Sequence, residues 1–257
     1  MKVLPVLMYH QVCREGTFEP SEFIVGTATF HRQMKYLKEH GYFTPRLKDL
    51  LSGKAADSGK KPVLLTFDDG YLNTYENAFP ILQEFGLRAL VGIIADPSVT
   101  TNSWDASKGY TSAPLMRAEH IREMALHGVE FGSHSFSHKS LPGLGDEALT
   151  RELAASKEAI ETMLGRAVEF LTYPYGDVDV RVKETARRVG YACAFATHTG
   201  PLHFHADFFE IRRTLVEDRA DDFYLYTIFS GVSKALMWSK WSAKRLLGMR
   251  NRFQYEL

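Results

Sequence analysis

The sequence is poor in the features that mark several large classes of protein. It has only two cysteines, Cys13 and Cys193, among 257 residues, so it cannot form the disulfide framework that stabilises small secreted domains. We expect both to act as small apolar residues in a reducing compartment. No apolar run approaches the roughly 18–20 residues that a membrane-spanning helix needs. The N-terminal stretch MKVLPVLMYHQV also lacks a small-residue cleavage site, which favours a cytoplasmic protein without a secretory signal.

Net charge is absent too, because 31 Lys and Arg residues balance 31 Asp and Glu residues. Phosphate binding usually requires a basic surface, so we do not expect nucleic acid as a partner. The charge is uneven, however: residues 231–257 hold six basic residues and one acid, a net charge of +5. We therefore divide the chain into a main domain, 1–230, and a basic C-terminal tail, 231–257.

Within the tail, residues 233–250 are expected to form a basic amphipathic helix. Trp238, Trp241 and Met249 fall broadly on one side, although Arg245 interrupts that side. One interpretation is peripheral contact with a membrane surface, with tryptophan at the interface and basic residues near anionic lipid. The other, which we prefer, is a helix that packs on the main domain through its aromatic residues.

Apolar runs alternate with amphipathic stretches along the main domain. The pattern predicts strands near 3–9, 63–67, 87–94, 129–132, 168–173, 191–196 and 209–216, and helices near 30–40, 72–85, 117–127, 146–164, 179–189 and 220–230. Thr29 is expected to cap the first of these helices. About seven strands alternating with helices predict an α/β fold with a parallel sheet. We expect a closed or nearly closed barrel, with an open doubly wound sheet as the alternative.

Polar residues follow four of the predicted strands. They are His10, the pair Asp68 and Asp69, the pair His134 and His138, and the turn that contains Pro174 and Tyr175. In a β/α barrel the carboxyl ends of the strands meet on one face, where active sites lie. The sequence therefore predicts that these side chains lie together.

His134 and His138 are four residues apart, so both could face one metal ion from a helical turn. The small neighbours Gly132, Ser133 and Ser135 would leave room for close approach. The alternative is two surface or capping histidines.

Asp68 and Asp69 are adjacent acids that directly follow a buried strand. Burying two neighbouring carboxylates is costly unless a cation compensates the charge of one of them. The other could then act as a base beside the ion. The alternative is a turn or a helix N-cap, since Asp-Asp-Gly also suits a turn. One carboxylate with two histidines forms a facial ligand set with open positions, typical of Zn²⁺ or Fe²⁺ sites.

Three motifs together resemble those of a known enzyme family. TFDDG at 66–70, HSFSH at 134–138 and YPYG at 173–176 are similar, in order and separation, to the first three motifs of the polysaccharide deacetylases. This is the NodB-homology group, carbohydrate esterase family four. The segments VLMYHQV and TFHRQMKYLKEHGY further resemble the branch that acts on poly-N-acetylglucosamine and related exopolysaccharides.

The resemblance covers about residues 1–230 and implies a distorted (β/α)₇ barrel that removes N-acetyl groups from amino sugars. It implies Zn²⁺ as the ion, with Fe²⁺, Co²⁺, Ni²⁺ or Mn²⁺ as alternatives. The implied roles are a metal site of Asp69, His134 and His138, Asp68 as general base, the Tyr175 N–H as an oxyanion donor, and His10 as general acid. Alternative functions are hydrolysis of O-acetyl sugars or of a small cyclic amide at the same site, or non-catalytic carbohydrate binding.

Two departures from the family pattern affect these roles. Tyr173 stands where the third motif usually begins with arginine, and the later aspartate-tryptophan motif is not evident. Arg213 is a candidate for the missing contact to Asp68. If His10 is not the acid, it is a strand-end histidine with a structural role.

Substrate contacts are expected from the third motif and from a long loop. Pro174 begins the turn of the third motif, and Trp104 in the loop 96–114 could stack on a pyranose ring. The loop would then be either a lid or a sugar platform.

Overall fold

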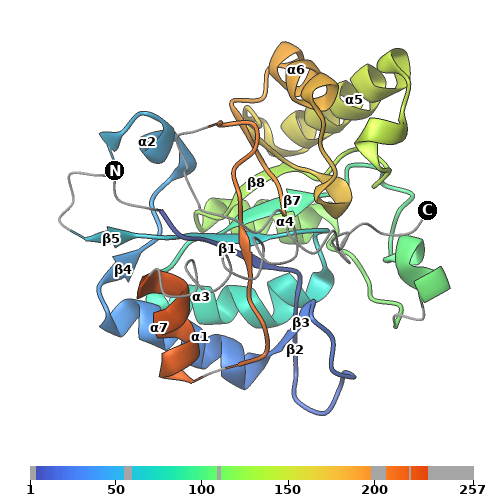
Figure 1. The fold of residues 1–257 in the computed structure, drawn as a ribbon. Coiled ribbons are helices and arrows are strands. Elements are labelled where there is room, and N and C mark those ends of the chain that lie inside the picture. The colour runs from blue at the N-terminus through green and yellow to red at the C-terminus, as the bar shows by residue number, and fades with distance from the viewer. Residues whose placement is uncertain (1–3, 55–59, 109–110, 198–206, 220, 231–257) are drawn as a thin grey trace, which may run out of the picture.

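The computed structural model describes residues 4–54, 60–108, 111–197, 207–219 and 221–230, and its centre is a curled parallel sheet (Figure 1). Seven strands pair in the order β10-β9-β8-β7-β6-β1-β11, and every adjacent pair is parallel. Their bounds are β1 Val6–Tyr9, β6 Leu64–Phe67, β7 Leu90–Ile93, β8 Glu130–Ser133, β9 Phe170–Thr172, β10 Cys193–Phe195 and β11 Thr214–Leu215. The predicted set of parallel strands is confirmed.

The two edges of this sheet are joined by the segment that leads into β11. Ala194 in β10 donates its N–H to the Phe208 carbonyl at 2.7 Å, and the Ile211 N–H donates to the Ala194 carbonyl at 3.0 Å. Four residues later, Leu215 is in register with Met8 of β1. The same segment therefore contacts both edges, and the sheet curls into an incomplete barrel rather than an open doubly wound sheet.

In the described residues, seven α-helices lie around the sheet, as Figure 1 shows. They are α1 Thr27–Glu39, α2 Leu47–Leu51, α3 Phe79–Phe85, α4 Ala118–Leu126, α5 Asp146–Leu164, α6 Val180–Val189 and α7 Asp222–Ser230. Six of them match predicted helices, and α2 was not predicted. A π-helical turn, η2 (Thr74–Ala78), precedes α3, where Pro80 has no N–H for regular α-helical bonding.

The expected cap of the first helix is wrong. Helix α1 begins at Thr27, two residues before Thr29. Its first turn is held by Glu15, whose carboxylate accepts from the Ala28 N–H at 2.6 Å and from the Thr27 hydroxyl at 2.7 Å. A carboxylate twelve residues upstream therefore does the work expected of a local cap, which no local sequence pattern indicates.

Two small parallel pairs were also not predicted. β2 (Gln11–Cys13) pairs with β3 (Ile24–Gly26), and β4 (Tyr42–Phe43) pairs with β5 (Lys61–Pro62). With two or three residues each, they are too short to show a clear period of two. The first pair directly follows His10 and so lies beside the carboxyl end of β1.

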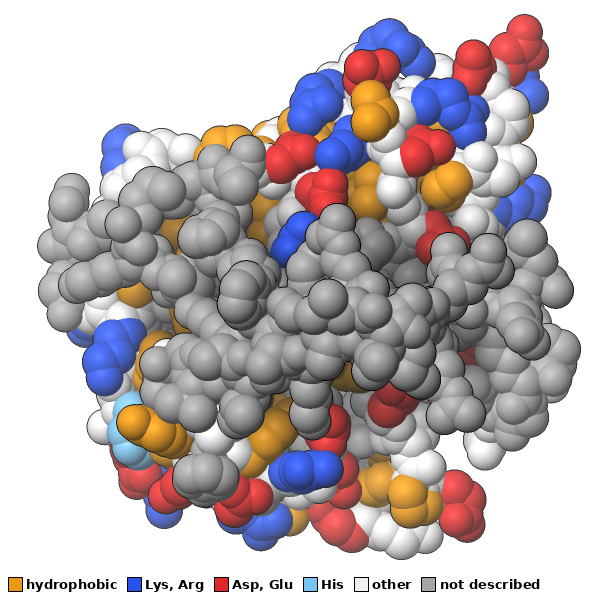
Figure 2. Space-filling model, viewed as in Figure 1, with side chains coloured by type: hydrophobic (Ala, Val, Ile, Leu, Met, Phe, Trp, Pro, Cys, Tyr) orange, Lys and Arg blue, Asp and Glu red, His pale blue; other side chains and the backbone are white. Residues whose placement is uncertain are grey.

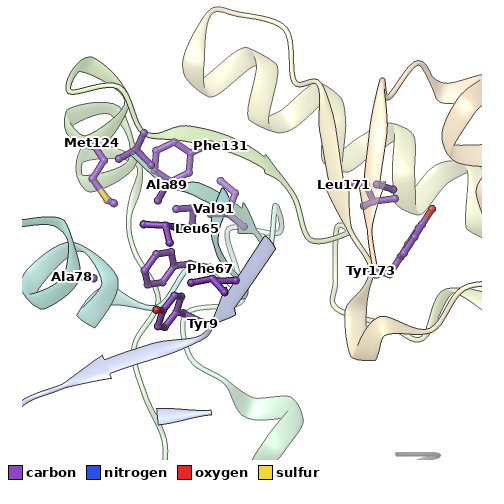
Figure 3. Packing of buried hydrophobic residues seen from close by; sticks show 14 of the residues in the cluster. Tyr9, Leu65, Phe67, Ala78, Ala89, Val91, Met124, Phe131, Leu171 and Tyr173 are labelled. Atoms are coloured by element: carbon purple, nitrogen blue, oxygen red, sulfur yellow. The ribbon is translucent and has the colours of Figure 1, made fainter. Parts of the chain in front are cut away.

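The larger hydrophobic core lies between the outer face of the sheet and the helices. Tyr9 stacks on Phe67 with ring centroids 5.2 Å apart, and Figure 3 shows both beside Leu65 and Val91, with Met124 of α4 nearby. Their strand neighbours point the other way because side chains alternate along a strand. Those neighbours form a second core inside the barrel: Val6, Leu64, Leu90, Phe170, Cys193, Phe195 and Ile211, with Leu4, Leu47 and Leu50.

Close packing continues inside the barrel above this apolar layer. A Cβ atom on Gly92 would collide with the Thr172 hydroxyl, and one on Gly132 would collide with the Phe170 ring. The barrel interior is therefore filled, and what remains at its carboxyl end is a layer of polar side chains.

Charged side chains of both signs are interspersed on the upper part of the face shown in Figure 2, around α5 and α6. Some of them pair, as Arg181 does with Asp146 at 2.9 Å and Arg151 with Glu147 at 3.3 Å. None of the helices in the described ranges combines the length and hydrophobicity needed to cross a bilayer. The predicted basic helix 233–250 lies outside the described residues.

Candidate metal and catalytic site

The polar layer at the carboxyl end of the barrel follows from strand alternation. Val6 and Leu64 point into the barrel, so His10 and Asp68, each four residues further on, are set toward the same side. The same alternation applies from Phe170 to Thr172 and from Ile211 to Arg213. Three strands and the segment that leads into β11 thus bring polar side chains to one place, as the sequence predicted for His10 and Asp68.

Asp69, His134 and His138 form a compact cluster. The Asp69 Oδ1 atom lies 3.1 Å from His134 Nε2 and 3.3 Å from His138 Nε2. All three side chains are buried, with 5%, 2% and 5% of their residue surface exposed. Their ligand atoms lie within 4.8 Å of one another, so the predicted set of three has converged.

The donor atoms fit a divalent ion. His134 Nδ1 lies 2.9 Å from the Thr172 carbonyl, which can only accept, so Nδ1 carries a proton. When Nε2 is protonated as well, it can hydrogen-bond to Asp69; when the ring is neutral, Nε2 has a lone pair, and a cation between it and the carboxylate removes their repulsion. Ligands about 2.0–2.2 Å from a tetrahedral or octahedral ion lie about 2.8–3.5 Å apart, and both measured distances fall in that range.

Charge couples these groups strongly. Burial alone would raise the pKa of Asp69, but hydrogen bonds and charge from His134 and His138 hold it well below its usual value. Burial would lower the pKa of His134, yet the nearby charges of Asp68 and Asp69 raise it. For His138, burial prevails and its pKa is lowered. The carboxylate is therefore kept ionised, as a metal ligand must be.

The turn between the two histidines is not helical, which corrects one expectation. Ser135 and His138 have φ values of 65° and 57°, in the left-handed region. The turn is held by hydroxyl groups: the His138 N–H donates to Ser135 Oγ at 2.9 Å, and the Ser135 N–H donates to Ser133 Oγ at 3.0 Å. Ser133 and Ser135 therefore build the turn, rather than merely leaving room for it.

Asp69 and Tyr175 share this unusual backbone, with φ values of 71° and 60°. Together with Ser135 and His138 they are all the non-glycine residues of positive φ in the part of the chain that the structure describes. Such conformations are disfavoured and persist where surrounding contacts enforce them, commonly at functional sites. Here every one of them lies in one of the three motifs.

Asp68 lies beside the cluster and is paired with Arg213. The guanidinium donates to both carboxylate oxygens, from Nη1 at 2.8 Å and from Nη2 at 2.6 Å. Burial would raise the pKa of Asp68, but the charges of Arg213 and His134 and the Arg213 hydrogen bonds lower it. The contact to Asp68 expected of Arg213 is confirmed.

His10 faces the same region from β1. Its ring contacts Phe23 with centroids 4.8 Å apart, and its Nδ1 atom is buried without a hydrogen-bond partner in the protein. Burial lowers the pKa of His10, while the charges of Asp69 and Asp68 oppose that shift. The ring is thus close enough to both acids to sense their charge.

The third motif forms the wall next to His138. Pro174 is buried at the start of a 3₁₀ turn, η5 (Pro174–Gly176), and Tyr173 donates its hydroxyl to the Phe209 carbonyl at 2.9 Å. The Tyr175 ring meets His138 edge to face, with centroids 4.7 Å apart. Trp104, from the 3₁₀ turn η3 (Ser103–Lys108), contacts His138 as well, with centroids 4.2 Å apart and a 30° tilt.

Several supporting residues were missed from sequence. Thr172 holds His134, and Phe23 packs on His10. The Tyr71 hydroxyl is hydrogen-bonded to Asp69, and burial together with the charges of Asp69 and Asp105 raises the pKa of Tyr71. Thr172 could have been found by alternation along its strand, and Tyr71 by its place directly after the first motif. Phe23 gives no such signal.

A family model described as polysaccharide deacetylase matches residues 55–194, more than half of the chain. The chain belongs to the polysaccharide deacetylase family. Deacetylases of this family depend on a metal ion, and Asp69, His134 and His138 form a group suited to hold one. The matched range includes these three residues and Asp68, but neither His10 nor Arg213.

Similar proteins extend the match beyond that range. YxkH of Bacillus subtilis, named as a polysaccharide deacetylase, is 28% identical over 83% of this chain and 71% of its own. The poly-beta-1,6-N-acetyl-D-glucosamine N-deacetylase of Staphylococcus aureus is 24% identical over 79% of this chain and 71% of its own. Both alignments are long enough to include most of the barrel.

Solved structures of deacetylases support the fold. The deacetylase PplD of Streptococcus pyogenes, in complex with acetate, superposes with a TM-score of 0.75 at 21% identity and covers 88% of this chain and 98% of its own. IcaB of Ammonifex degensii gives 0.70 at 24% identity, over 84% and 92%. The deacetylase is therefore a barrel of the NodB-homology type, as the sequence predicted.

Proposed function

We propose that this deacetylase hydrolyses the N-acetyl amide of N-acetylglucosamine units in a polysaccharide or a lipid-linked saccharide. One observation carries the proposal: Asp69 lies 3.1 and 3.3 Å from the two histidines, with the ionised Asp68 beside them. The similarity to the N-deacetylase of Staphylococcus aureus supports the choice of substrate class. In the reaction, water adds to the amide carbonyl and the C–N bond breaks, which leaves acetate and a free amine.

Asp69, His134 and His138 would hold the metal ion, and we propose Zn²⁺ as the native one. Such an ion, when bound, supplies a Lewis acid for the carbonyl oxygen and makes water more acidic. Nitrogen and oxygen donors at this spacing suit Zn²⁺ and also Fe²⁺, Co²⁺, Ni²⁺ and Mn²⁺. Metal analysis of the purified protein identifies the ion.

Asp68 is proposed as the general base. Its lowered pKa keeps it ionised near neutral pH, and each of its oxygens can accept a further hydrogen bond besides the one from Arg213. It can therefore orient a water molecule and take its proton during attack. Arg213 fixes the carboxylate plane, so the accepting oxygen cannot rotate away.

His10 is proposed to act on the leaving nitrogen, and Tyr175 on the carbonyl oxygen. Protonated His10 would donate its proton to the leaving nitrogen, because an amine anion is a poor leaving group. The backbone N–H of Tyr175 would donate to the oxyanion as negative charge develops there. The contact of the Tyr175 ring with His138 supports this role, because it holds the turn beside the metal ligands. Pro174 would shape the same wall toward the substrate.

Acetate release from N-acetylglucosamine oligomers, with and without a chelator, tests the proposal. Asp68→Asn should abolish release while the protein still binds metal, whereas His134→Ala should lose both. Release from O-acetyl sugars or cyclic amides but not from N-acetylated oligomers would replace the substrate class. Full activity after complete metal removal would refute the metal-dependent mechanism itself.

We further propose that residues 1–230 form the catalytic domain and that the basic tail, 231–257, contacts an anionic membrane surface or the barrel. The support is its sequence: Trp238 and Trp241 lie among six basic residues. Sedimentation with anionic liposomes at low and high salt distinguishes the two. Binding that is strong at low salt and lost on truncation after residue 230 supports the membrane. Equal sedimentation with and without the tail refutes it.

A further inference from the structure

The two histidines of the metal site are supported in different ways. His134 donates from its outer nitrogen Nδ1 to the Thr172 carbonyl at 2.9 Å, with Thr172 Oγ1 at 2.6 Å. The outer nitrogen of His138 is buried and has no hydrogen-bond partner. A metal-binding imidazole usually gives its outer N–H to an acceptor, which fixes the ring orientation. His138 lacks that support.

Aromatic contacts surround His138 instead. The Trp104 ring lies nearly face to face with it, with centroids 4.2 Å apart and planes 30° apart. The Tyr175 ring meets it edge to face at 4.7 Å. Both contacts limit rotation of the imidazole, and the indole is the one that packs over a face of the ring.

The loop near Trp104 is held together by Asn102, two residues earlier in the chain. Asn102 is only 3% exposed, accepts from the Ala113 N–H at 2.7 Å and donates to the Thr111 carbonyl at 3.2 Å. These bonds tie the two sides of the loop 96–114 together next to Trp104. The indole is therefore presented from a braced segment and can act as a fixed wall.

We propose that Trp104 is a positioning residue for the metal ligand His138, its indole face taking the place of the missing outer hydrogen bond. The inference rests on the metal site of the proposed function. An imidazole that donates its lone pair to a cation becomes positively polarised, and an aromatic face attracts such a ring more strongly than a neutral one. The contact therefore stabilises the loaded site more than the empty site, which raises metal affinity.

This role constrains the substrate contact expected of Trp104. The indole face that packs on His138 is occupied, so that face is closed to a pyranose ring. Only the opposite face or the indole edge could meet a sugar. Loss of Trp104 would then affect metal binding even with no substrate present.

The test measures metal binding without substrate, by competition of Zn²⁺ or Co²⁺ between the full-length protein and a chelator. Trp104→Leu removes the aromatic face and should weaken binding about 10- to 100-fold, the usual loss when the outer support of a metal ligand is removed. Trp104→Phe keeps an aromatic face and should stay within about threefold of the wild type. His134→Ala serves as the control that the measured ion occupies this site.

Three results would overturn parts of the account separately. Wild-type affinity in Trp104→Leu, or equal losses in the Phe and Leu variants, refutes the positioning role while the metal site stands. Metal binding unchanged by His134→Ala refutes the proposed metal site.

A second measurement keeps native Trp104 and so does not depend on the folding of a Leu variant. In a Trp238→Phe, Trp241→Phe protein, Trp104 is the one tryptophan left of three, and Co²⁺ should quench its emission as the site fills. Unchanged emission on loading would show that the indole does not lie against the ligand.

Discussion

The pair of Asp68 and Arg213 offers a sharp test because both residues are only 1% exposed. The guanidinium also donates to the Ala196 carbonyl at 3.1 Å and to the Thr66 hydroxyl at 3.2 Å. These hydrogen-bond acceptors of the Arg213 guanidinium all lie inside the barrel. Arg213→Met keeps most of the side-chain volume but removes the charge and these hydrogen bonds.

We expect Arg213→Met to lower the free energy of unfolding by about 3–5 kcal/mol, because it leaves a buried carboxylate without a countercharge. That is a large share of the roughly 5–15 kcal/mol that holds a typical domain together. Asp68→Asn should also be costly, since it leaves the buried guanidinium unpaired. The double variant, which buries no charge at this place, should be less destabilised than the sum of the two single variants.

Urea denaturation of metal-free protein measures these free energies. The neighbour Arg212 provides a matched control: its side chain is 37% exposed and meets Glu210 only at 3.8 Å, so Arg212→Met should cost less than about 1 kcal/mol. Equal effects of the two arginine substitutions, or exact additivity in the double variant, would show that the pair does not stabilise the fold as argued.

Three further predictions concern other positions. As the proposed general acid, His10 must be protonated, and burial lowers its pKa below 6.5. We therefore expect kcat/KM to fall as pH rises through that pKa. His10→Gln should lower the rate about 10²–10⁴-fold and remove this basic limb, and a surviving limb in the pH–rate profile would assign it to another group. Burial raises the pKa of Glu130, so the free energy of unfolding declines as pH rises above the pKa that Glu130 has in the unfolded chain. Glu130→Gln can still accept from the Leu47 N–H, so its melting temperature should rise relative to that of the wild type between pH 4 and pH 8. A constant difference in melting temperature would contradict this. Gly92→Ala presses a methyl group on Thr172 and should lower the free energy of unfolding by about 1–3 kcal/mol. Because Thr172 supports His134, the same variant should also bind metal more weakly. The control Gly143→Ala has open space around its Cβ and should show neither effect in the same denaturation and chelator assays.

The sequence predicted the long elements well because their periodicity is strong. Helix α5 spans Asp146–Leu164 as expected. Helices α3, α5 and α6 end at Gly86, Gly165 and Gly190, which take left-handed φ values of 62°, 63° and 94°. Strand ends were less exact: the strand predicted over 209–216 pairs regularly only at Thr214–Leu215. Its first half instead bonds to β10, a tertiary arrangement that periodicity does not encode.

The site was predictable in its members but not in its support. The sequence predicted that Asp69, His134 and His138 converge, because each of their motifs directly follows a strand. The non-helical turn at Ser135 did not, since His-x₃-His spacing is equally typical of a helix. The placement of Arg213 beside Asp68 depends on a contact 145 residues apart in the sequence, which only the three-dimensional fold reveals.

The segment that joins β10 to β1 also carries Arg213, so one stretch of chain completes the barrel wall and supplies the countercharge of Asp68. During synthesis, the metal ligands and Asp68 leave the ribosome well before residue 213. Until then Asp68 lacks the guanidinium that donates to both of its carboxylate oxygens. A nascent chain arrested before residue 213 emerges should therefore lack both the segment that joins the two edges of the sheet and the partner of Asp68.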